Sequence, residues 1–158
     1  MKGRRAGMFT LPAPVAVRLR EIATAGRAGS VILLNGTGEA DRFQIVGGLA
    51  KAMARPVHRV PLARVVSKYI GETEKNLARC FVTAEREGAV LLFDEADALF
   101  GKRSEVRDSH DRYANQHVGR LLAMIEQYDG VVLVATNRRA LVDPELLRYI
   151  LWVIASSE

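Results

Sequence analysis

The chain has 158 residues, a net charge of +5 at pH 7 and 49% apolar residues, which is typical of one globular domain with a sizeable core. Its one cysteine, Cys80, excludes an internal disulfide and indicates a reducing, cytoplasmic setting. Pro12 and Pro14 interrupt the stretch that follows the basic N-terminus, so we expect neither a signal peptide nor a membrane span.

Short apolar runs alternate with amphipathic segments along the chain. Residues 1–13 are expected to form a loose arm that leads into a helix over 14–25. Strands are then predicted at residues 31–34, 57–60, 89–93, 131–135 and 151–154. Longer helices are predicted at residues 41–55, 72–87 and 112–127, with Asp41 as the cap of the first and a short helix after Asp143-Pro144. Cys80 lies beside Phe81 in the second of these, which favours a core role.

This alternation predicts an α/β fold, with a parallel sheet covered by helices on both faces. We expect two parts: an arm and leading helix over residues 1–29, and the core domain over residues 30–158. No repeat or second-domain boundary is visible.

Two adjacent acids, Asp94 and Glu95, follow the apolar run that ends at Phe93. In a parallel sheet this position lies at the carboxyl edge, where ligands bind. Asp94 there is suited to holding Mg²⁺ and Glu95 to orienting an attacking water. Alternatively, the acids only decorate a helix N-terminus, where the helix dipole favours them.

Four segments together resemble the AAA+ ATPases, in order and over roughly residues 30–155. Residues 67–77 (SKYIGETEKNL) resemble the first pore-loop segment, and residues 89–100 resemble the Walker B strand. Residues 134–138 (VATNR) resemble the sensor-1 strand, and residues 142–148 (VDPELLR) resemble the segment that leads to the arginine finger. Residues 101–115 resemble most the AAA+ proteins of bacterial contractile injection systems.

The resemblance implies a P-loop NTPase core, with a doubly wound, mainly parallel α/β sheet of five strands. It also implies the use of ATP and Mg²⁺. It implies Asp94 as the metal residue, and Glu95, Asn137 and Arg148 as the catalytic residues. The implied pore loop is Lys68, Tyr69, Ile70 and Gly71, with the tyrosine gripping a polypeptide substrate inside a ring of AAA+ subunits. Asn137 also fits an ordinary turn, and Tyr69 a partly buried loop position.

The phosphate-binding loop departs from the motif G-x-x-x-x-G-K-[ST]. Only Gly36, Thr37 and Gly38 remain of it, with Gly38 at the second glycine, whereas Glu39 replaces the lysine and Ala40 the hydroxyl residue. Leu33 stands at the first glycine position when the motif is aligned on Gly38. These five cofactor-binding positions, residues 36–40, therefore predict impaired ATP binding, because a glutamate repels phosphate.

Three hypotheses remain open: a working ATPase, a pseudo-ATPase that acts as an interaction module in a larger AAA+ or injection-system assembly, and a truncated core without an independent role. In the family that the chain resembles, a helical lid follows the core and packs on the neighbouring subunit. We expect no such lid after the last strand here and therefore a monomer or small oligomer. The expected partners are other AAA+ subunits and a polypeptide. A nucleic-acid partner would rest on net charge alone and is not favoured.

Overall fold

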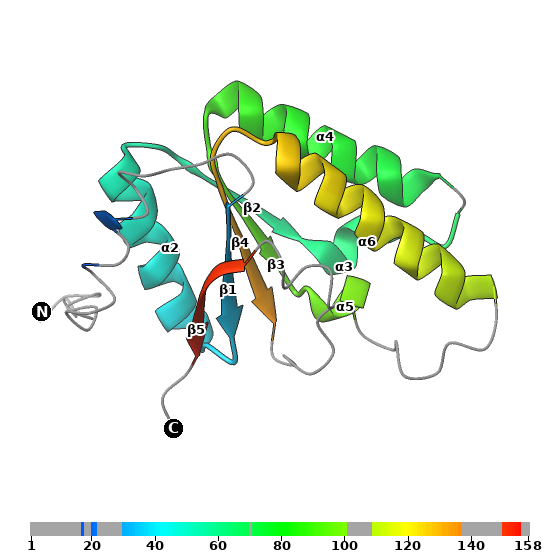
Figure 1. Ribbon diagram of the computed structural model, residues 1–158, viewed down its shortest axis with the longest axis horizontal. Helices are drawn as coiled ribbons and strands as arrows, with labels where there is room; N and C mark the ends of the chain where they lie inside the picture. The colour runs from blue at the N-terminus through cyan, green and yellow to red at the C-terminus, as the bar shows by residue number, and fades with distance from the viewer. Residues whose placement is uncertain are drawn as a thin grey trace, which may run out of the picture.

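The computed structural model (Figure 1) describes residues 30–69, 71–100, 109–136 and 150–155 together with Val17, Arg20 and Glu21, with the backbone alone for residues 30, 100, 109–117 and 150–155. The described strands are β1 (Ser30–Asn35), β2 (Val57–Pro61), β3 (Val90–Asp94), β4 (Val131–Thr136) and β5 (Ile150–Ala155). The described helices are α2 (Glu39–Met53), α3 (Leu62–Val65), α4 (Glu72–Glu87), α5 (Asp97–Phe100) and α6 (Ser109–Gln127).

The strands form one sheet in the order β2-β3-β4-β1-β5. Every neighbouring pair is parallel, which confirms the predicted α/β fold. Although β1 comes first in the chain, it lies between β4 and β5. Its carboxyl end therefore lies beside that of β4, with β3 the next strand along.

Side chains alternate between the two faces of the sheet, and both faces are apolar. On β1, Leu33 joins a core with α4 and α6, whereas Ile32 and Leu34 join a second core with α2. Figure 1 shows α4 and α6 together over one face and α2 over the other. Strands that are buried on both sides are continuously apolar, and this explains the unbroken apolar runs in the sequence at β3 and β4.

The element boundaries differ from the sequence prediction at several points. The predicted cap at Asp41 is wrong, because α2 begins at Glu39 with Gly38 as its N-cap and without a side-chain cap bond. Helix α6 begins at Ser109 rather than at residue 112. The one-turn helices α3 and α5 were not predicted, since four residues are too few to show a helical period.

Some sequence expectations fall on residues outside the described ranges. These are the arm, most of the helix predicted over residues 14–25, and the short helix after Asp143. The division of the chain at residue 30 therefore stays a prediction. Within the part of the chain that the structure describes, no helix has the length and apolar character needed to cross a membrane.

Candidate functional site

The candidate site lies where β1, β3 and β4 end. The amide of Gly36, just after β1, donates to the carbonyl of Thr136 in β4 (2.8 Å), and the amide of Ala96, just after β3, donates to the carbonyl of Ala135 (3.0 Å). These bonds attach the segments that follow β1 and β3 to the end of β4. The glycine-containing loop and the acidic pair are thereby held at one edge of the sheet.

The loop between β1 and α2 is short. Only Gly36, Thr37 and Gly38 separate the end of the strand at Asn35 from the start of the helix at Glu39. The phosphate-loop motif places roughly six residues between its strand and its lysine. Leu33, aligned with the first motif glycine, is fully buried in β1. That alignment is therefore wrong: the loop is shortened as well as substituted.

The side chains at the start of α2 offer little to a phosphate. Glu39 and Ala40 are exposed in the first turn, where the helix dipole favours the glutamate. Thr37 is buried, and among the described residues its Oγ1 has no hydrogen-bond partner. Gly36 has a φ of 67°, a left-handed conformation that suits glycine.

Asp94 ends β3 as a buried carboxylate with 3% of its surface exposed. Its Oδ2 accepts hydrogen bonds from Arg59 Nε (3.0 Å) and lies 2.9 Å from Arg59 Nη2. Its Oδ1 accepts the backbone amide of Glu95 at 2.8 Å. A buried carboxylate requires such partners, and here the main one is the guanidinium of Arg59 from β2.

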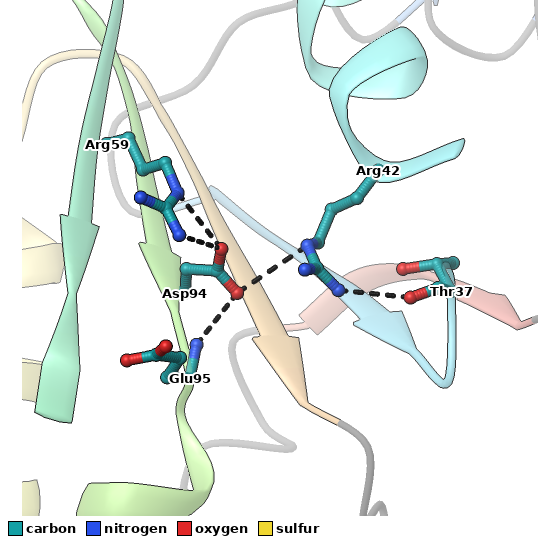
Figure 2. Close-up of polar contacts among 5 residues, drawn as sticks. All are labelled: Thr37, Arg42, Arg59, Asp94 and Glu95. Atoms are coloured by element: carbon teal, nitrogen blue, oxygen red, sulfur yellow. Dashed lines mark hydrogen bonds and ion pairs between the residues drawn. The ribbon is translucent and has the colours of Figure 1, made fainter. Parts of the chain in front are cut away.

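A second arginine reaches Asp94 from the opposite side. Arg42 Nε lies 3.5 Å from Asp94 Oδ1, an ion pair without hydrogen-bond geometry, while its Nη1 donates to the carbonyl of Thr37 at 3.0 Å. Figure 2 shows the Asp94 carboxylate between the guanidinium groups of Arg42 and Arg59. The next residue of α2, Phe43, lies against Arg59, whose Cζ is 5.9 Å from the ring centroid.

Sequence reasoning missed both arginines. Arg59 lies on β2, 35 positions from Asp94, and the strand register brings them together: Pro61 pairs with Asp94, two residues beyond Arg59. Arg42 lies one helical turn after Glu39. A cation one turn beyond a lost lysine was the only sequence signal for it.

Glu95 directly follows Asp94 in a left-handed conformation with a φ of 55°. Its side chain is exposed, and in Figure 2 its carboxylate points away from Arg42 and Thr37. A non-glycine residue in this conformation is uncommon and often marks a functional turn. The turn separates the two acids, so that Asp94 is buried while Glu95 faces outward.

The other predicted site residues lie apart from this cluster or outside the described residues. Tyr69 is 64% exposed, with Lys68 Nζ 5.7 Å from its ring centroid, and its amide donates to Ser67 Oγ at 3.1 Å. Gly71 is the N-cap of α4 with a φ of 80°. Ile70, Asn137 and Arg148 lie outside the described ranges, so their predicted roles stay predictions. Residues 101–108, the larger part of the segment 101–115, also lie outside these ranges. Thr136, just before Asn137, donates to Asp97 Oδ1.

A parallel sheet with a glycine loop that leads from one strand into a helix, and a buried carboxylate at the end of the next strand but one, is typical of the P-loop class of nucleotide-binding domains. The comparison with known families is consistent with this class. Residues 32–154 match the model of the ATPase family associated with various cellular activities (AAA). The chain belongs to this family.

Individual proteins give the same result. The chain is 37% identical over 107 residues to the cell division cycle protein 48 homolog of Archaeoglobus fulgidus, covering 63% of this chain and 15% of that protein. It is 34% identical over 109 residues to the 26S proteasome subunit RPT4 of Saccharomyces cerevisiae, covering 63% and 25%. It is 31% identical over 126 residues to the vesicle-fusing ATPase of Caenorhabditis elegans, covering 72% and 15%. The chain thus spans a quarter or less of the length of these relatives.

The residues present do not fit a divalent cation at Asp94. Both of its oxygens already face guanidinium groups, and Ala40 offers no hydroxyl. Nor do the described residues contain a cluster of three or more metal-binding side chains. The Mg²⁺ that AAA ATPases in general use with ATP therefore has no free carboxylate at Asp94.

Proposed function

We propose that this chain is an AAA nucleotide-binding domain of ATPase type whose binding of Mg-ATP is impaired. The observation that carries the proposal is the three-residue loop between β1 and α2. A loop of this length cannot wrap a polyphosphate with successive backbone amides as the full motif does. The domain therefore lacks the backbone cradle as well as the lysine.

The charge at Glu39 works in the same direction. Two unit charges 4 Å apart interact by about 4 kcal/mol at an effective dielectric constant of 20. A micromolar site has only about 8 kcal/mol of binding free energy in total. Exchanging an attractive lysine for a repulsive glutamate is thus large enough to remove useful affinity, although solvent at this exposed position weakens the effect.

The test is calorimetric titration of the chain with Mg-ATP. We expect a dissociation constant weaker than about 1 mM. We also expect negligible turnover that is unchanged in Glu95→Gln. A micromolar constant would overturn the proposed impairment of Mg-ATP binding, and turnover that Glu95→Gln abolishes would show a working ATPase with Glu95 in the family's catalytic role.

Loop repair separates length from charge. Glu39→Lys with Ala40→Thr restores the motif side chains but leaves the loop at three residues, so we expect binding to stay weak. Adding about three residues before Gly36 should then raise affinity at least about ten-fold, since each 1.4 kcal/mol changes the constant by that factor. Leu33→Gly is not a repair, because it would remove a buried core side chain. Tight binding by the substituted chain without the insertion would show that the two side chains, and not the loop length, caused the defect.

A second candidate function is an interaction module, without turnover, in an assembly of AAA subunits. Tyr69, on a loop fixed at its base, favours this function. Thr73 Oγ1 accepts the amide of Ser67 (2.9 Å) and donates to its carbonyl (3.3 Å), so the exposed ring is presented from an ordered turn. Relatives include a proteasome subunit and a vesicle-fusing ATPase. We therefore propose AAA subunits and a polypeptide as partners.

Fluorescein-labelled casein is a suitable probe of polypeptide binding. We expect Tyr69→Ala to weaken the binding of casein at least about five-fold. This corresponds to roughly 1 kcal/mol for the loss of an aromatic contact with the polypeptide. Val82→Ala on α4, also exposed, is the matched control and should leave binding unchanged. Equal effects of the two substitutions, or no binding by the chain, would count against the module.

A further inference from the structure

Asp94 has more cationic neighbours than it needs for neutrality. One carboxylate faces two guanidinium groups, so the formal charge of the three side chains is −1 + 2 = +1. Arg59 alone satisfies Oδ2 through two nitrogens, at 3.0 and 2.9 Å. Arg42 is therefore not required to neutralise Asp94, and its position needs another explanation.

The contacts of Arg42 join two parts of the site. Its side chain is 15% exposed, its Nη1 binds the carbonyl of Thr37 in the loop, and its Nε faces Asp94 Oδ1 at 3.5 Å. A cation between the loop and the strand-end carboxylate is what a P-loop site otherwise obtains from its lysine and bound magnesium. Here the Arg42 side chain, from α2, lies between the loop at Thr37 and the carboxylate of Asp94 (Figure 2).

We infer that Arg42 is a built-in bridging cation that takes the place of the divalent metal ion, so that this edge of the sheet is held together without metal. Its guanidinium bridges the β1–α2 loop and Asp94 in the protein itself. A divalent cation added to a cluster that already carries an excess positive charge would be repelled by both arginines. Arg42 is thus a positioning residue.

This inference rests on the proposed function, because a domain that turned over Mg-ATP would need Asp94 for the metal. The role of Arg42 is tested without nucleotide. The test can therefore fail while the proposed weak binding of Mg-ATP holds, and it can succeed if that binding proves tight. The first arm is titration of the metal-free chain with Mn²⁺, an electron-paramagnetic-resonance probe for the Mg²⁺ position. Wild type and Asp94→Asn should give the same curve within about two-fold. Binding to wild type at least about ten-fold tighter than to Asp94→Asn would overturn the inference.

The second arm is a double-mutant cycle followed by urea unfolding. Arg42→Met keeps the apolar stem of the side chain and removes its charge. We expect it to lower the folding equilibrium constant at least about ten-fold in wild type and less than about three-fold in Asp94→Asn. The effects of two substitutions are non-additive in this way when the two side chains interact. Arg42→Lys should recover part of the loss, whereas Arg79→Met, at an exposed position of α4, should cost little in either background.

An equal penalty for Arg42→Met in both backgrounds would mean that the arginine only packs, and would overturn the inference. A third measurement does not depend on any variant folding. The thermal midpoint of the wild-type chain should be the same in EDTA and in MgCl₂ at matched ionic strength. Stabilisation by MgCl₂ that NaCl does not reproduce would show that a metal, rather than Arg42, holds this edge.

Discussion

Among the described residues, burial clearly shifts the acid–base chemistry of Cys80 and Tyr128. Cys80 lies on α4 at the margin of the core, where burial raises the pKa of its thiol and a backbone hydrogen bond partly opposes the shift. Tyr128 follows α6, is buried, and donates its hydroxyl to the carbonyl of Ala89. Burial raises the pKa of this phenol as well, partly opposed by Arg55. Both side chains therefore stay neutral to a higher pH than they would in water.

Cys80 should react slowly with thiol reagents. Only the thiolate attacks, and a raised pKa lowers its fraction at neutral pH. We expect the rate with a disulfide reagent at pH 7.5 to be at least about ten-fold below that of a free cysteine analogue. The rate should increase more steeply above pH 8 than that of the analogue. A rate equal to that of the free thiol would contradict the prediction that Cys80 has a packing role.

Tyr128→Phe should lower the free energy of unfolding by about 1 kcal/mol, the net contribution of one buried hydrogen bond. The same variant should change the alkaline limb of the stability curve. Because the folded-state pKa of Tyr128 is raised, the unfolded chain releases this proton first as the pH passes about 10. Wild type should therefore lose stability above pH 10 faster than Tyr128→Phe. Parallel curves from urea unfolding at several pH values would argue against the shift.

At the scale of elements, two of the helices that flank the sheet, α2 and α4, end in the same way with different residues. The C-cap of α4 is Gly88 (φ 65°), and that of α2 is Ala54 (φ 53°); both are left-handed. In each, the cap amide bonds back to carbonyls of the last turn. An alanine in this conformation places its Cβ too near the following carbonyl, so α2 carries a cost that α4 avoids.

Exchanging the cap residues should therefore have opposite effects. We expect Gly88→Ala to destabilise the chain by about 1 kcal/mol and Ala54→Gly to stabilise it by a similar or smaller amount. The added Cβ at Gly88 meets no atom within 4 Å, so the penalty would come from the backbone alone. Thermal unfolding of both variants measures this. Changes of the same sign would indicate that contacts, not the left-handed backbone, determine the two caps.

At the scale of the molecule, one sheet separates two apolar cores. Leu49 of α2 belongs to the core on one face and Leu121 of α6 to the core on the other, and both side chains are fully buried. The strands between them contribute alternate residues to each core. We therefore expect a loss of packing in the core on one face to destabilise the core on the other face through the strands that they share.

Leu49→Ala and Leu121→Ala should each cost about 2–5 kcal/mol, the usual range for a large-to-small change in a core. We expect both variants to unfold in one transition, with circular dichroism and the fluorescence of the single tryptophan, Trp152 of β5, changing together. Fluorescence that changed before circular dichroism in only one variant would show that the two cores unfold separately.

The sequence by itself determined the described strands, the parallel sheet and the place of the acidic pair. Burial on both faces makes β3 and β4 continuously apolar, and the alternation of strands with helices fixes the class of fold. Asp94 and Glu95 could be placed at the edge because they directly follow such a strand. These inferences need only local patterns, and local patterns are what a sequence displays.

Only the tertiary structure decided what surrounds Asp94. Arg59 and Arg42 reach it from β2 and α2, and their approach depends on strand register and helix position, which no local period encodes. The length of the phosphate loop was decided in the same way: the sequence already predicted a strand that contains Leu33, but only the structure starts α2 at Glu39 rather than near Asp41 and so leaves three residues between strand and helix. The sheet edge was predictable since it follows from burial, whereas the charge around Asp94 depends on side chains far apart in the chain that only the packed fold brings together.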